Sequence, residues 1–195
     1  MPDTLLILAA VGYGLAALAY LGLSGLIISS WKRRHGRLLV LATGLSTIWG
    51  VLLALAAWGW MPPGLGLASE VGRNGAWLGL MLYILHLRLP PGATLPAPLR
   101  LIRALGSVLV IGLLAGSLMP VIAPTQPVMP QWAGNLGLLL LTVLGLVLVE
   151  QVFRSTRPED RWAIKFLCLG LGGLFVYDFY LYANAMLFGA MDGQI

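Results

Sequence analysis

Long stretches of apolar residues alternate along this chain with short segments that gather the prolines and most of the charges. A helix that crosses a bilayer needs about 20 mostly apolar residues. Six windows meet this length, at positions 5–30, 38–60, 67–87, 101–119, 132–153 and 162–188. The pattern predicts an all-α integral membrane protein with six transmembrane helices. Because the links between windows are short, we expect three antiparallel hairpins, formed by helices 1 and 2, 3 and 4, and 5 and 6.

The amino-acid composition supports this class of protein and excludes several kinds of functional site. Hydrophobic residues make up 59% of the chain and charged residues only 10%, whereas a soluble domain carries about 25% charged residues. The single cysteine, Cys168, excludes an internal disulfide and a cysteine-based metal site. The sequence contains no glycine-rich phosphate loop, no HExxH and no GxSxG. We therefore predict no catalytic residue, no metal and no other cofactor.

Charges in the links predict the orientation. All of the 12 lysines and arginines except Arg73 flank the links after windows 1, 3 and 5. Segments 61–66 and 120–131 on the opposite side carry none. Basic residues collect on the cytoplasmic side of a membrane, so we expect the N-terminus outside, and the C-terminus outside as well. The net charge of +5 then reflects orientation beside the lipid bilayer, and no nucleic-acid partner is expected.

Prolines and glycines predict how the helices pack. All 12 prolines lie outside the six windows, which predicts unbroken helices. Small residues allow helices in a membrane to approach closely. We expect this role for the following glycines: Gly22, Gly25, Gly112, Gly116, Gly172 and Gly173.

Charged residues inside the apolar windows are the candidate functional residues, because burying a charge in a membrane is costly. Glu70 and Arg73 have i,i+3 spacing and share a helix face. Asp178 lies sixteen residues into the sixth window, about 24 Å along a helix, and the expected topology brings it to the depth of Arg73. One interpretation is a structural ion pair of Arg73 with Asp178. The other is an outer-leaflet sensing or ligand pocket that also includes Asn74, Tyr177, Tyr180 and Tyr182.

Two groups of polar residues have simpler explanations as well. The three tyrosines fit the aromatic belt at a membrane–water boundary. His86 and Glu150 lie near the cytoplasmic ends of their windows. They are close enough in depth for a hydrogen-bonded pair or proton relay, and solvation at the interface is the preferred explanation.

The last third of the chain resembles a known protein family. Positions 150–188 read EQVFRSTRPEDRWAIKFLCLGLGGLFVYDFYLYANAMLF. The EQ-x-x-R start, the RWAIKFLCLGLGGLF core and the YD-x-YLY ending resemble the membrane region of the PrsK family. These proteins are sensor histidine kinases of XrtA/PEP-CTERM systems in Gram-negative bacteria. The element E-x-x-R-N-G-A-W at 70–77 is similar to the third span of that family.

The resemblance implies that residues 1–195 are the transmembrane sensor domain of an inner-membrane kinase. GAF-like and kinase domains follow in the family and are absent from this chain. Implied partners are the kinase portion, a response regulator for exopolysaccharide and protein-sorting genes, and a second copy in a homodimer. A cytoplasmic kinase would need an odd number of spans after Ile195, so the chain is expected to be a fragment. The family-like positions are Glu70, Arg73, Trp77, Lys165, Tyr177, Asp178, Tyr180 and Tyr182.

Two other functions are compatible with the residues alone. In a small transporter or channel subunit, Asp178 and Arg73 would line a path. In a structural membrane subunit, they would serve only packing.

Overall fold

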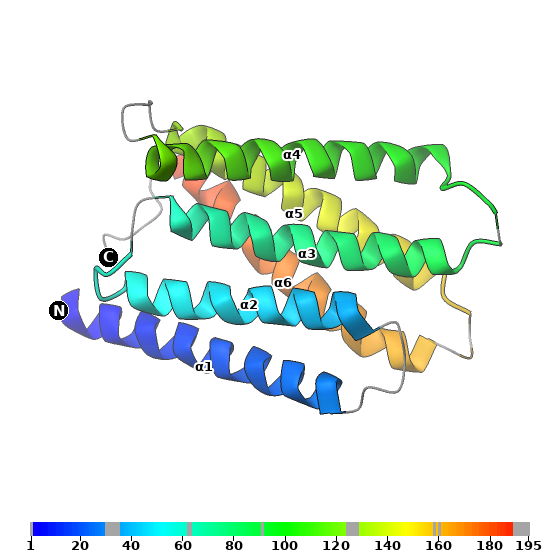
Figure 1. Cartoon of the computed structure of the whole chain (residues 1–195), viewed down its shortest axis with the longest axis horizontal. Coiled ribbons are helices and arrows are strands. Elements are labelled where there is room, and N and C mark those ends of the chain that lie inside the picture. The colour runs from blue at the N-terminus through cyan, green and yellow to red at the C-terminus, as the bar shows by residue number, and fades with distance from the viewer. Residues whose placement is uncertain are drawn as a thin grey trace. The chain divides into compact units, whose positions relative to one another are not determined.

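The computed structural model of the chain describes residues 2–29, 36–61, 64–90, 92–123, 129–157, 159 and 161–188. Six helices account for nearly all of them (Figure 1): α1 (Pro2–Ser29), α2 (Gly36–Ala56), α3 (Leu65–Leu87), α4 (Ala97–Ile122), α5 (Gln131–Arg154) and α6 (Arg161–Phe188). Within these described residues, five helices are long and apolar enough to cross a membrane, namely α1, α2, α4, α5 and α6. The chain is therefore all-helical with the character of a multi-pass membrane protein. That α3 also spans a membrane stays a prediction.

Helix α4 is longer than its predicted window and includes two prolines, Pro98 and Pro120. Pro98 is the second residue of the helix, where a backbone N–H needs no partner within the helix. Pro120 lies in the last turn, and the N–H that it lacks would have bonded the carbonyl of Gly116. Pro98 and Pro120 thus lie within α4 although both lie outside the predicted window, because the helix extends beyond that window at both ends. Of the two, only Pro98 is at a position where no hydrogen bond of the helix is lost.

The chain divides into two compact units. The first contains α1, α2, the beginning of α3 as far as Ala76, and the end of α4 from Gly112. The second contains the remainder of α3 and α4 together with α5 and α6. Each unit is held together by one closely packed pair of helices, α1 with α2 and α5 with α6.

Helices α1 and α2 meet closely at Gly50. A β-carbon on Gly50 would lie 3.0 Å from the β-carbon of Ala17 and 3.0 Å from the carbonyl oxygen of Tyr13. On the same contact, the buried Ser24 hydroxyl donates a hydrogen bond of 2.7 Å to Thr43 Oγ1. The Thr43 hydroxyl in turn donates to the carbonyl of Leu39 at 3.0 Å. These two hydroxyls are therefore satisfied within the pair.

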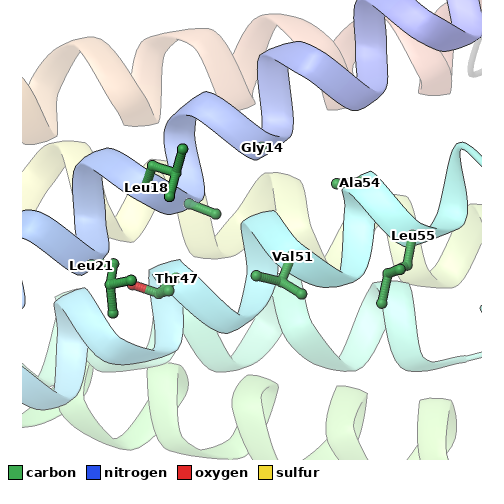
Figure 2. A pocket seen from close by; sticks show the side chains of 8 residues that line it. Gly14, Leu18, Leu21, Thr47, Val51, Ala54 and Leu55 are labelled. Carbon is green, nitrogen blue, oxygen red and sulfur yellow. The ribbon is translucent and has the colours of Figure 1, made fainter.

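A shallow apolar groove of about 320 Å³ runs between α1 and α2 (Figure 2). Leu18 and Leu21 flank it from α1, and Val51 and Leu55 from α2. Thr47 is its one hydroxyl-bearing residue, and that hydroxyl donates to the carbonyl of Thr43 at 3.0 Å. The groove therefore offers apolar surface alone.

In the first unit, the start of α3 lies against α4. Gly64 precedes α3 with a φ of 87°, and a β-carbon there would collide with the carbonyl oxygen of Ser117. Only glycine combines this left-handed backbone with so close an approach. The predicted hairpin of helices 3 and 4 otherwise stays a prediction.

Helices α5 and α6 pack along two stripes with alternating spacings of three and four residues. In α5 the stripe consists of Gly134, Leu138, Leu141, Gly145, Leu148 and Val152. In α6 it consists of Cys168, Leu171, Phe175, Asp178, Tyr182 and Ala185. This is the spacing of knobs-into-holes packing. The tightest contact seats the Phe175 ring on Gly145, where a β-carbon would lie 2.7 Å from Phe175 Cε1.

The glycines at close approaches are mostly not the predicted ones. Added β-carbons on Gly22, Gly25, Gly112 and Gly173 would meet nothing within 4 Å in the described parts of the chain. Gly172 makes an ordinary contact with Val149, and Gly116 faces the flexible side chain of Met129. The structural role belongs to Gly50 and Gly145, because these two lie in the centres of the paired helix faces.

The Phe175 contact predicts the effect of a single methyl group. Gly145→Ala raises the intrinsic helix propensity, but the added methyl group displaces the Phe175 ring. We therefore expect the free energy of unfolding in detergent to fall by about 1–3 kcal/mol. Gly173→Ala on α6 adds the same methyl group in open space and is expected to be neutral or stabilising. Equal effects of the two substitutions would contradict this account, and Phe175→Leu should partly rescue Gly145→Ala.

Candidate functional site: two buried charged residues

Arg73 lies in the first unit and is only 3% exposed. Its guanidinium carbon lies 4.0 Å from the ring centroid of Trp49 on α2. The Trp49 ring also makes an edge contact with Tyr13 on α1, with ring centroids 5.6 Å apart. A cation held over an indole away from water gains about 2 kcal/mol. The Tyr13–Trp49–Arg73 stack therefore stabilises the charge and joins α1, α2 and α3.

Buried hydrogen-bond donors of Asn74 and Trp49 lie beside Arg73. Asn74 is fully buried, and its Oδ1 accepts a long hydrogen bond of 3.4 Å from Arg73 Nη2. The Nδ2 atom of Asn74 and the Nε1 atom of Trp49 are buried and find no acceptor in the described part of the chain. Glu70, one turn before Arg73, is half-buried. This cluster can bind an additional acceptor oxygen, and buried donors commonly bind such an oxygen from water or a ligand.

Asp178 lies in the second unit and is 4% exposed. It occupies the buried stripe of α6, between Phe175 and Tyr182. Because Phe175 seats on Gly145 in the antiparallel helix α5, three residues along α6 bring Asp178 level with Thr142. Thr142 is fully buried, and its hydroxyl donates to the carbonyl of Leu139 at 2.7 Å. Asp178 and Thr142 are thus two buried polar residues at a similar level of this helix pair.

The three candidate tyrosines separate into two groups. Tyr177 and Tyr180 are 63% and 65% exposed, which suits an aromatic belt. Tyr182 is 1% exposed and belongs to the buried stripe one turn after Asp178. Of the three, only Tyr182 lies on the same face of α6 as Asp178.

The inner polar residues are both exposed. The Glu150 carboxylate accepts a hydrogen bond of 3.1 Å from Arg154 Nη1, and both side chains are largely solvent-accessible. His86 is exposed in the last turn of α3. These positions suit solvated residues at a membrane boundary. Among the described residues, no group of three or more His, Cys, Asp or Glu side chains is placed to hold a metal ion.

Arg73 and Asp178 belong to different units, and their pairing stays a prediction. Sequence reasoning found both charges but missed Trp49, the aromatic partner of Arg73, and Tyr13, which contacts Trp49. A signal for Trp49 was available, since it lies in the middle of an apolar window where no aromatic belt accounts for it. Tyr13 offered no comparable signal.

Comparison with known proteins adds no relative: no family matches the chain, and neither a curated protein nor a solved structure does so.

The Trp49 contact predicts a coupled loss of stability. Trp49→Leu should lower the free energy of unfolding in detergent by about 2 kcal/mol, because the buried guanidinium loses its aromatic partner. Trp58→Leu is the control, since Trp58 is 70% exposed. In an Arg73→Met background, Trp49→Leu should lower the free energy of unfolding by clearly less than it does in the parent protein. An unchanged cost in that background would show that the cation contact contributes nothing.

Proposed function

We propose that the chain is the membrane-embedded signal-sensing region of a two-component sensor histidine kinase of the PrsK type, in a bacterial inner membrane. The resemblance of positions 70–77 and 150–188 to that family suggests the class. The observation that carries the proposal is the burial of Arg73 and Asp178, two charged residues at family-like positions inside apolar helices. A charge retained inside a membrane helix is a candidate functional group by default.

In this proposal all six helices span the membrane as three hairpins, with the N-terminus outside. Arg73 lies eight residues after the beginning of α3, and Asp178 ten residues before the end of α6. These separations correspond to about 12 Å and about 15 Å along the helices. Because successive spans alternate in direction, both residues then lie at similar depth in the outer leaflet, where they can form an ion pair.

The signal acts on that ion pair. A ligand shifts an equilibrium only if it binds the two packings differently. Acceptor oxygens of a ligand would compete with Asp178 for Arg73 and would gain the unused donors of Asn74 and Trp49. Helix α6, released from α3, would pass the change to the kinase portion and so to a response regulator. Dimerisation through the cytoplasmic parts belongs to the same proposal.

The neutral substitution Asp178→Asn tests the function. It preserves shape and removes the charge, so in a sensor we expect the protein to insert normally while transcription of exopolysaccharide and PEP-CTERM genes changes. In a transporter, the same variant should instead lose flux in reconstituted vesicles. Tyr177→Phe is the matched control, because its exposed side chain is the immediate neighbour of Asp178.

Unchanged transcription and unchanged stability in Asp178→Asn would refute both the pocket and the ion pair. The gene gives a second test. The family assignment requires an open frame beyond the Ile195 codon, with an odd number of further spans and then a kinase. A stop codon with no kinase gene nearby would count against it.

A further inference from the structure

The described lysine and arginine side chains of the second unit all lie at one end of it. We call this surface the basic end: Arg88, Arg100, Arg103, Arg154, Arg157 and Lys165. Here α3 ends, α4 begins, α5 ends and α6 begins, all at the right in Figure 1. Segments 131–149 and 166–188, which lead away from it, contain no lysine or arginine. The unit therefore has one strongly cationic end.

The basic end is a fixed surface. Arg88 Nη1 donates a hydrogen bond of 2.9 Å to the carbonyl of Ser155, which ties the end of α3 to the end of α5. A β-carbon built on Gly106 of α4 would lie 3.9 Å from Leu144 Cδ1 of α5, so the two helices are in contact there. Arg103 is less than one turn of α4 from this contact. The backbone that carries the cations is thus held by contacts within the unit.

The acidic residues at the basic end neutralise only part of its positive charge. In the described part of this unit, Glu150 and Glu159 are the acidic residues that accompany the cations at this end. Glu150 binds Arg154 in a pair whose side chains are 64% and 73% exposed, and such surface pairs are weak. Arg157 and Lys165 are exposed. Positive charge is therefore available to an anionic partner.

An exposed apolar stripe begins at the basic end. Trp162 is 72% exposed and Phe166 is 59% exposed, and their ring centroids lie 5.5 Å apart. Lys165 Nζ lies 5.7 Å from the centroid of the Trp162 ring. The same face of α6 continues with Leu169 and Val176, which are also exposed. Cations at the head of an apolar stripe match a molecule with an anionic head and an apolar tail.

We propose that the basic end is a binding site for the phosphate headgroup of an anionic phospholipid. Arg157 and Lys165 contact the phosphate, and the acyl chains follow the α6 stripe past Phe166 and Leu169. Trp162 fixes the depth of the site in the bilayer, since tryptophan prefers the membrane interface. An acidic protein segment would suit the cations but would leave the stripe uncovered. The site is independent of the sensing proposal.

Lipid-specific quenching of Trp162 tests the site. The full chain is reconstituted in phosphatidylcholine vesicles with a minor fraction of phosphatidylglycerol, and bromine labels are placed on the acyl chains of one lipid at a time. The fluorescence of Trp162 is the difference between the parent protein and Trp162→Phe. We expect brominated phosphatidylglycerol to be enriched at least about fivefold beside Trp162, because each nearby cation contributes a factor of about five.

The double variant Arg157→Gln/Lys165→Gln should reduce this enrichment to the bulk composition. Arg37→Gln removes an exposed arginine from the first unit and should leave the enrichment intact. Quenching by the two lipids in proportion to their mole fractions would overturn the proposal and favour an acidic protein segment as the occupant. Retention of the enrichment in the double variant would also overturn it.

Discussion

The dominant constraint on this molecule is the cost of removing charged and hydrogen-bonding side chains from water inside apolar helices. Lipid cannot satisfy them, so the protein must. The first unit places Arg73 over Trp49, whose ring also contacts Tyr13, and beside Asn74. The second places Asp178 on the buried stripe between α5 and α6. The close approaches at Gly50 and Gly145 are part of the same solution, because polar groups can be enclosed only where helices come close.

The position of Asp178 also bears on the register in which α5 and α6 pair. In the observed register the carboxylate is level with Thr142. A slip of α6 by one turn in either direction would place it level with Leu138 or with Gly145, where the facing side chain offers no polar atom. A buried polar residue that selects one register among several is well known in coiled coils. The close contact of Phe175 with Gly145 favours the same register.

Helix positions could be predicted from the sequence more readily than helix faces. The window at 162–188 nearly matches α6 (Arg161–Phe188), because length and hydropathy mark a membrane helix. The inward face of such a helix is not marked in this way, since residues toward lipid and toward protein are equally apolar. Leucines and glycines occur on both sides of α5 and α6. Sequence reasoning therefore identified Asp178 as a candidate, yet could not separate buried Tyr182 from exposed Tyr177, or select Gly145 among 25 glycines.

The Ser24–Thr43 hydrogen bond bears on how the protein is made. Both hydroxyls belong to the first two helices, and both are satisfied before any later segment is needed. During synthesis the α1–α2 pair can leave the translocon with both of these hydroxyls already hydrogen-bonded. Arg73 then emerges on α3 when its aromatic partner, Trp49, is already in place on α2. Asp178 follows last, after α5 has supplied its side of the stripe. The N-to-C order of the chain is thus also a workable order of assembly, in which each costly group meets a helix that has already been made.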